Sequence, residues 1–332
     1  MLVSGVVLLF IVAIFVYTTF TTRDTWLRME LYAEVVQTLS APAAPAGAMT
    51  GFIPKHIWSY WEAPPKGDGA QQDAAVQACL SSWKRFCPDY EITVFNAETA
   101  KMYLPQTLTQ DKVDSVQRYT DFLRLFVLVE HGGIWIDASM LLTAPLDWVH
   151  QSQQQRPGVE LVAYYMAGYT TRPEWPVVES WFLACTPQSQ LMRHWRNEFC
   201  QLLKHESPGA YISDLTHNRN VDLQDLNFPT YLTIHASLQA VLQGQAAYEP
   251  GPPLSERLVA FKAEDGPFKL QVDNHWNSEK VAALLCGSGA QGALRSTDLQ
   301  RLLLIKFRST ERTALAARGC NLQALLNSVM EA

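Results

Sequence analysis

Two aspartates and an arginine lie close together in residues 119–140, which read YTDFLRLFVLVEHGGIWIDASM. Asp121 and Arg124 are three positions apart and therefore share one face if the segment is helical. Asp137 follows the apolar residues 134–136, which predict a short buried strand, so its carboxylate should lie at the tip of that strand. Ligands bind at the carboxyl ends of strands in open α/β sheets. The segment can therefore bring two carboxylates and a guanidinium toward one crevice, and carboxylate oxygens are the ligands that hard cations such as Mg²⁺ and Mn²⁺ take.

A helix and a strand must position these groups. Apolar side chains recur at intervals of three and four before the double glycine, which predicts one buried helical stripe: Val113, Val116, Tyr119, Leu123, Phe126 and Val127. Gly132 and Gly133 should end the helix, because glycine accepts the left-handed conformation of a helix C-cap. The predicted strand follows at once, so the polar groups of the two elements are expected to lie close together.

This order of features resembles the signature of nucleotide-sugar glycosyltransferases of the DXD sugar-binding-region type, in particular capsular polysaccharide synthesis proteins. In that group, an aspartate and an arginine on a helix precede Gly-Gly, an apolar strand and Asp-x-Asp or Asp-Ala-Ser/Thr, here Asp137-Ala138-Ser139. Upstream segments are also similar: Ile53-Pro54-Lys55-His56-Ile57-Trp58, Tyr60-Trp61, Ser82-Trp83 and Pro88-Asp89-Tyr90-Glu91. The resemblance covers residues 52–200 well and the remainder loosely.

The resemblance implies an α/β, GT-A-like nucleotide-diphospho-sugar transferase fold with a mainly parallel central sheet. It implies an enzyme that moves a hexose from a nucleotide-diphosphate sugar to a saccharide or glycolipid acceptor. Asp121 would face the nucleoside, and Arg124 would hold the carboxylates or the phosphates of the site. Asp137 and Ser139 would bind Mn²⁺ or Mg²⁺, although Ser139 stands where a second acid is expected and its neutral hydroxyl is a weak ligand.

Further donor-binding residues are expected at two other places. Trp58, Tyr60 and Trp61 lie at the end of the first predicted strand, where an aromatic ring can stack on the base, although core packing is the alternative for any one of them. Lys306 closes an apolar run near the C-terminus and can neutralise the diphosphate leaving group, or it can be a solvated basic end. The complete donor-binding set is Trp58, Tyr60, Trp61, Gly132, Gly133 and Lys306.

Each polar group also has an ordinary structural interpretation. Asp121 and Arg124 can form a surface ion pair, and Asp137 can cap a turn. His235 is either a core histidine or an acceptor-site group, and His275 lies in a predicted loop. The catalytic base stays open, because an inverting transferase needs one and a retaining enzyme does not. The loop acids that can supply it are Asp214, Asp222, Asp225 and Asp273.

The N-terminus carries a long apolar segment. Residues 2–20 contain no charged side chain and are long enough to cross a bilayer core of roughly 30 Å as a helix. A cleaved signal peptide is the alternative, but its apolar core is usually shorter and preceded by basic residues. We therefore predict a transmembrane anchor in residues 1–20, a stem in residues 21–51 and a transferase domain in residues 52–332. The protein would lie in the Golgi if eukaryotic, or in the inner membrane with a cytoplasmic domain if bacterial.

The composition fits one large α/β domain. A hydrophobic fraction of 48% is sufficient for a core, and a net charge of −6 disfavours nucleic acid as a partner. Predicted strands and helices alternate, which favours a largely parallel sheet, whereas residues 206–229 and 243–279 are expected to be long loops. The six cysteines contain no CxxC pair. Cys79 and Cys87 can pair in an oxidising lumen, or they can be small buried apolar side chains.

Two other functional classes stay open. A haloacid-dehalogenase-like phosphatase also places an aspartate at a strand tip, but it needs a second aspartate two residues later, where this chain has Ser139, and a downstream acidic pair. A non-catalytic carbohydrate-binding protein with a decayed transferase fold is compatible with the serine. Hydrolysis of the donor by the purified protein would distinguish that class from an active enzyme.

Overall fold

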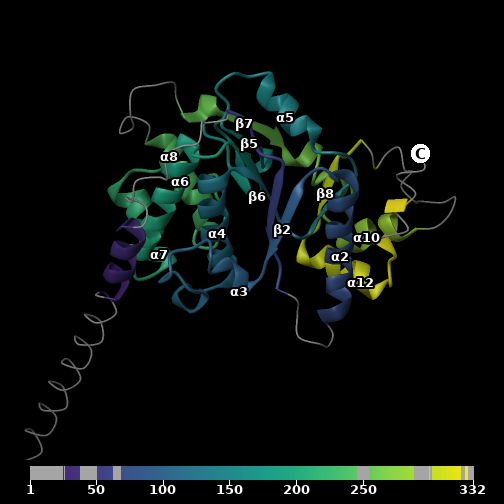
Figure 1. The fold of residues 1–332 in the computed structure, drawn as a ribbon, viewed down its shortest axis with the longest axis horizontal. Helices are drawn as coiled ribbons and strands as arrows, with labels where there is room; N and C mark the ends of the chain where they lie inside the picture. The colour runs from purple at the N-terminus through teal and green to yellow at the C-terminus, as the bar shows by residue number, and fades with distance from the viewer. Residues whose placement is uncertain are drawn as a thin grey trace, which may run out of the picture.

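One six-stranded sheet organises the chain, and helices cover both of its faces (Figure 1). The computed structural model describes residues 25, 27–37, 51–62, 69–244, 254–287, 299, 301–322 and 326–327. In spatial order the strands are β2 Glu91–Phe95, β1 His56–Tyr60, β3 Gly133–Ile136, β6 Val178–Cys185, β5 Leu161–Tyr165 and β7 Leu258–Lys262. Every strand of this sheet except β6 runs in the same direction. The prediction of an α/β domain with a mainly parallel sheet is confirmed.

The helices fall into two groups on either side of the sheet. Figure 1 shows α4, α6, α7 and α8 on one side and α2, α10 and α12 on the other. The helices are α2 Gly69–Phe86, α3 Ala97–Ala100, α4 Val116–His131, α5 Asp147–Gln154, α6 Gln190–Cys200, α7 Pro208–Ser213, α8 Thr233–Gln243, α9 Lys269–Asp273, α10 Ser278–Cys286 and α12 Ser309–Ala317. Short 3₁₀ turns lie at Gln110–Lys112, Ala167–Tyr169, Gln201–Lys204, Leu254–Arg257 and Ala263–Asp265, and Asp214–Asn218 forms a π-helical turn.

Strand β3 shows how the sheet divides the interior into two cores. Successive side chains of a strand point to opposite faces. Trp135 packs with Phe122 in the core that contains α4, whereas Ile134 and Ile136 pack with Trp83 of α2 in the core on the other face. All four residues of β3 are buried, so the polar side chain that this strand brings toward a ligand follows it, at its tip.

Helix α4 is capped at its N-terminus by Ser115 and at its C-terminus by Gly132. The Ser115 side chain caps its first turn by accepting a hydrogen bond from the backbone N–H of Arg118. Gly132 ends it with a φ of 63° and donates its N–H to the carbonyl oxygen of Leu128. A Cβ atom added at Gly132 would lie 2.5 Å from the backbone nitrogen of Pro187, so both the conformation and the space require glycine. The predicted glycine stop is therefore observed, and the helix begins at Val116.

A two-stranded antiparallel sheet joins the C-terminal region to the residues that follow β3. Strand β4 Met140–Leu142 pairs with β8 Leu304–Lys306, and Met140 lies opposite Lys306. The backbone N–H of Phe307 donates to the carbonyl oxygen of Ser139, at 2.9 Å. This pairing fixes a residue near the C-terminus against the Asp137-Ala138-Ser139 turn.

The expectation of two long loops was wrong, and of the two alternatives for Cys79 and Cys87 the structure shows buried, unpaired side chains. Residues 206–229 and 243–279 are not continuous loops, because the first range contains α7 and the second contains β7 and α9. Strand β7 consists of five residues, LVAFK, and pairs in parallel with β5. Cys79 and Cys87 do not pair with each other. Both are free and buried, and the disulfide that the structure contains joins Cys286 to Cys320.

The predicted membrane anchor is not supported. Residues 1–20 lie outside the described residues. Within the described part of the chain, no helix combines the length and the apolar character needed to cross a bilayer. The helical residues 27–37 are short and include Arg28, Glu30 and Glu34. This finding contradicts the predicted single-pass anchor and the Golgi or inner-membrane location that was inferred from it.

Candidate active site

The carboxyl ends of β1 and β3 open into a cavity of about 590 Å³, which we call the strand-tip cavity. Strand β6 runs antiparallel to β3, so its first residues reach the same place, and α4 contributes one polar face. The cavity is lined by charged side chains from segments far apart in the sequence: Glu62, Asp121, Arg124, Asp137, Glu179, Lys306 and Arg312. It brings together the predicted residues Asp121, Arg124, Asp137, Ser139, Lys306, Tyr60 and Trp61.

Arg124 joins the two aspartates. Its Nη2 lies 3.1 Å from Oδ1 of Asp121, and its Nη1 lies 3.7 Å from Oδ1 of Asp137. The guanidinium also donates to the carbonyl oxygens of Thr120 and Ser180, and the residue is only 4% exposed. A planar group with several fixed donors can hold two partners at once, which a lysine ammonium does with less geometric control. The surface-pair interpretation of Asp121 and Arg124 is excluded by their burial.

Asp121 is the most perturbed carboxyl group of the cavity. It is 3% exposed, and this burial raises its pKa to about 6. The negative charge of Asp137 raises the pKa further, whereas Arg124 and His235 oppose the rise. A buried carboxyl that contacts an arginine at 3.1 Å and feels the charge of a second carboxylate is typical of a functional site. Asp121 can therefore exchange a proton near neutral pH.

Lys306 binds the side chains on both sides of Ala138. Its Nζ donates to Oδ2 of Asp137 at 2.6 Å and to Oγ of Ser139 at 3.0 Å. Burial favours the neutral form of Asp137, but the charges of Lys306 and Arg124 outweigh it and hold the pKa of this carboxyl below its ordinary value. Asp137 is therefore an ionised carboxylate with a lysine ammonium in contact with it.

The side chains around Asp137 do not form a binding site for Mn²⁺ or Mg²⁺. Such ions take several oxygen ligands, mostly carboxylates. Here Oδ2 of Asp137 and Oγ of Ser139 accept from Lys306, and Oδ1 of Asp137 accepts from Nε1 of Trp135 at 3.2 Å. No group of three His, Cys, Asp or Glu side chains within the described ranges can hold a metal. The two predicted metal ligands, Asp137 and Ser139, thus bind the ammonium group of Lys306.

The predicted aromatic residues divide between the cavity and the core. Tyr60 and Trp61 line the cavity, and the Tyr60 hydroxyl donates to a carboxylate oxygen of Glu62. Trp58 is 4% exposed, stacks on Phe95 and donates its Nε1–H to the carbonyl oxygen of Gly132. Trp58 therefore belongs to the core. Gly132 and Gly133 do not line the cavity. At Gly133 an added Cβ would lie 2.7 Å from the carbonyl oxygen of His56, so these glycines allow α4, β1 and β3 to approach.

Glu179 and Arg312 are cavity residues that the sequence reasoning did not identify. Glu179 lies at the second position of β6, and its Oε2 is 3.6 Å from Nε2 of His235 on α8. Arg312 lies on α12, with its guanidinium carbon 6.0 Å from the Trp61 ring centre. The sequence feature that could have identified Glu179 is its position as an acidic residue beside an apolar predicted strand. Arg312 had no comparable signal, because its approach depends on β4 pairing with β8.

None of the loop acids considered as a catalytic base lines this cavity. Asp222 pairs with Arg172, and Asp273 pairs with Lys269. Asp225 accepts hydrogen bonds from Thr171, and Asp214 accepts one from Asn218. His275 is also absent from the lining, and its φ of 53° reflects a local turn. These residues are therefore placed in surface contacts.

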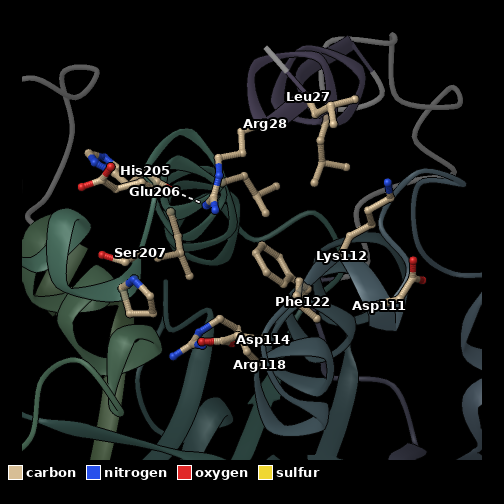
Figure 2. Close-up of a pocket in the computed structure, with 15 residues that line it drawn as sticks. Leu27, Arg28, Asp111, Lys112, Asp114, Arg118, Phe122, His205, Glu206 and Ser207 are labelled. Atoms are coloured by element: carbon tan, nitrogen blue, oxygen red, sulfur yellow. Dashed lines mark hydrogen bonds and ion pairs between the residues drawn. The ribbon is translucent and has the colours of Figure 1, made fainter. Parts of the chain in front are cut away.

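A second cavity of about 500 Å³ lies between the helical residues 27–37, the start of α4 and residues 202–208 (Figure 2). We call it the N-terminal cavity. Arg28 points across it and donates to the carbonyl oxygen of His205 at 2.8 Å, and Arg118 pairs with Asp114 at its floor. It contains Lys112 and Asp111 at its edge but none of the predicted site residues.

Comparison with known proteins gives one family. The profile of the family "Capsular polysaccharide synthesis protein" matches residues 45–212, which include α4, β3 and the Asp137-Ala138-Ser139 turn. No curated protein matches the sequence.

Several solved glycosyltransferase structures are similar at low identity. Mouse xyloside xylosyltransferase 1 is 10% identical, with 77% of this chain and 98% of that chain covered and a TM-score of 0.41. The galactosyltransferase LgtC in complex with donor and acceptor sugar analogues is 12% identical, with coverages of 82% and 95% and a TM-score of 0.38. The PaToxG glycosyltransferase is 15% identical, with coverages of 71% and 94% and a TM-score of 0.31. TM-scores below 0.5 are too low to assign a shared fold.

Proposed function

This chain belongs to the capsular polysaccharide synthesis protein family and is a glycosyltransferase, and we propose that it moves a hexose from a nucleotide-diphosphate sugar to a saccharide or glycolipid acceptor. We assign it a GT-A-like donor-binding fold. The mainly parallel sheet supports this proposal, because its strand tips form one charged cavity at the edge where α/β sheets bind ligands.

One observation carries the proposal: Arg124 holds Asp121 and Asp137 together in a buried network that opens into the strand-tip cavity. Buried charges are costly unless they are paired and hydrogen-bonded, and this network satisfies them without contributing to an apolar core. Such an arrangement is expected where a ligand with its own charges and hydroxyl groups must be oriented. A nucleotide-diphosphate sugar carries both.

The donor would lie along the cavity with its diphosphate near Lys306. Tyr60 and Trp61 offer aromatic surface for the base, and Asp121 offers a carboxylate to the ribose or the base edge. Negative charge grows on the leaving diphosphate as its bond to the sugar breaks, so a fixed positive charge there stabilises the transition state more than the ground state. Arg124 maintains the positions of the two carboxylates during this step.

The acceptor would approach the part of the cavity that contains Glu179. This carboxylate lines the cavity beside Tyr231 and His235 and is held by the 3.6 Å contact with the histidine. A carboxylate within reach of the acceptor hydroxyl can take its proton as the new bond forms. Glu179 therefore replaces the loop acids as the candidate base.

The test is a binding and turnover assay on the full chain. UDP, GDP, ADP and CDP are screened for thermal stabilisation, and the sugar conjugate of the best binder is then incubated with and without saccharide acceptors. We expect one or two nucleotides to raise the unfolding temperature, and the conjugate to lose its hexose by transfer or slow hydrolysis. Stabilisation by none of the four nucleotides would contradict the proposed function. Binding without any release of sugar would favour the non-catalytic alternative.

A further inference from the structure

We infer that Lys306 takes the place of a divalent cation at the donor diphosphate, so that this glycosyltransferase binds and uses its donor without a metal ion. The inference rests on the proposed function, because it concerns the charge that faces the leaving group. It goes beyond that function in naming a lysine ammonium as the source of the charge.

The position of Lys306 is imposed by the fold. Its backbone N–H donates to the carbonyl oxygen of Pro267 at 3.0 Å, and its own carbonyl oxygen accepts from Nε2 of Gln271 at 2.7 Å. It pairs with Met140 across β4 and β8, and the residue as a whole is 9% exposed. A flexible surface lysine would have none of these restraints. The ammonium is therefore held at the strand tip before any ligand arrives.

The same contacts oppose a metal ion. A cation binding between Asp137 and Ser139 would have to displace Nζ from distances of 2.6 and 3.0 Å, and the two positive charges would then face each other in a partly buried site. Ser139 offers no negative charge in compensation. The motif carboxylate thus orients the lysine, and the serine accepts one of its hydrogen bonds.

Lys306 retains capacity for the ligand. An ammonium group has three N–H donors. Within the described residues, two of them are directed to Asp137 and Ser139, which leaves one for a phosphate oxygen at the cavity. Charge-assisted hydrogen bonds of this kind are about twice as strong as neutral ones.

Arg312 supplies a second cation. It lines the same cavity, and no hydrogen-bond partner is present in the described structure for its buried Nε. Its charge and that of Asp137 interact, so the two groups lie in the same local field. Lys306 and Arg312 together carry two positive charges, which match the roughly two negative charges of the diphosphate in a nucleotide-diphosphate sugar.

The bonds, the electron pair and the proton of the transfer step are all accounted for without a metal ion. The bond between the anomeric carbon and the diphosphate oxygen breaks, and its electron pair leaves with the diphosphate. The acceptor oxygen forms the new bond to the anomeric carbon and passes its proton to the carboxylate proposed above, Glu179. Lys306 stays protonated and donates its free N–H to the leaving oxygen.

The first experiment measures the affinity of the full chain for the nucleoside diphosphate found in the screen, by calorimetry in excess EDTA and in Mn²⁺ or Mg²⁺. We expect affinities that agree within about threefold in all three conditions. Binding that appears only with a metal ion would overturn the inference while leaving the proposed function intact. Absence of binding in every condition would refute the proposed function, and the inference with it.

The second experiment moves the positive charge. Lys306→Met should weaken nucleotide binding in EDTA by more than about tenfold, whereas Lys112→Met, a matched change at the N-terminal cavity, should leave it unchanged. The double variant Lys306→Met with Ser139→Asp restores two motif acids, so Mn²⁺ should now increase its affinity for the nucleotide by more than about tenfold. Wild-type affinity in Lys306→Met would overturn the inference. If Lys306→Met fails to fold, the nucleotide affinities of Lys306→Arg and of the wild type in EDTA test the inference in its place.

Discussion

The strand-tip cavity and the N-terminal cavity have similar volumes and similar residue types, yet they differ in how their charges are held. In the N-terminal cavity, Arg118 pairs with Asp114 one helical turn away, and the Asp114 side chain is 53% exposed. In the strand-tip cavity, Asp121 and Arg124 are almost fully buried, and the carboxylate of Asp137 meets Lys306 from 169 positions away in the sequence. Volume therefore does not identify the site. The burial of the carboxylates distinguishes the strand-tip cavity, because the Asp121 side chain is 4% exposed beside Arg124 and the Asp114 side chain is 53% exposed.

The difference has an energetic basis. The ion pair of Arg118 with Asp114 is open to water on its carboxylate side, where water and salt screen it, so the pair contributes about 0–1 kcal/mol. Removing one member of a buried pair leaves an uncompensated charge and costs roughly 3–5 kcal/mol. Equivalent substitutions in the two cavities should therefore have unequal consequences, and the N-terminal cavity provides matched controls for each prediction below.

The largest effect is expected for Asp137→Asn. Without the carboxylate, the ammonium of Lys306 loses its ionic partner and the donor loses the group that orients that lysine, so kcat/KM for sugar transfer should fall by at least about 10³-fold. The measurement is initial-rate kinetics with varied donor. Asp114→Asn at the N-terminal cavity is the control. A rate for Asp137→Asn within tenfold of wild type would remove Asp137 from the site.

A smaller loss is expected for Arg124→Lys. A lysine cannot hold Asp121 and Asp137 while also donating to the Ser180 carbonyl oxygen, so the two carboxylates should separate and kcat/KM should fall by about 10²-fold. The free energy of unfolding in urea should fall by roughly 1–3 kcal/mol. Arg28→Lys at the N-terminal cavity, where the guanidinium donates to the carbonyl oxygen of His205, should change both quantities much less, and equal effects at the two arginines would invalidate the comparison of cavities.

Asp121 should make stability depend on pH. Its pKa is raised from 3.8 to about 6 in the folded protein, so the folded state holds this proton more tightly than the unfolded chain does. The stabilisation from that proton is complete below about pH 4 and is lost as pH rises through about 6, a change of roughly 3 kcal/mol. Urea unfolding of wild type and Asp121→Asn between these pH values measures it. Parallel pH profiles for the two proteins would show that Asp121 has an ordinary pKa.

The smallest effect is expected for Asp114→Ala. Because this carboxylate is largely exposed, its removal should change the free energy of unfolding by less than about 1 kcal/mol and leave the affinity for the donor nucleotide unchanged. Thermal unfolding with and without the nucleotide measures both. A tenfold loss of nucleotide affinity in this variant would show that the N-terminal cavity also binds the donor.

The sequence was informative wherever local pattern and local structure coincide. The apolar stripe before Gly132 defined α4, the apolar residues after it defined β3, and their order placed Asp121, Arg124 and Asp137 at one sheet edge. These features depend on helix periodicity, glycine conformation and strand alternation, all of which act over short distances.

The sequence was less informative where long-range pairing decides the structure. Lys306 was recognised as a candidate cation, but its contacts with Asp137 and Ser139 follow from the pairing of β4 with β8, which no local pattern specifies. The same pairing carries α12 and Arg312 to the cavity. Trp58 was assigned to the donor site from its position in β1, although its indole satisfies the Gly132 carbonyl oxygen in the core.

The most direct measurement is a crystal structure of the full chain with the nucleoside diphosphate that stabilises it, grown in the presence of EDTA. The account predicts the diphosphate in the strand-tip cavity, with a phosphate oxygen within hydrogen-bonding distance of the Lys306 ammonium and the base beside Tyr60 or Trp61. A diphosphate bound in the N-terminal cavity, beside Arg28 or Arg118, would contradict it.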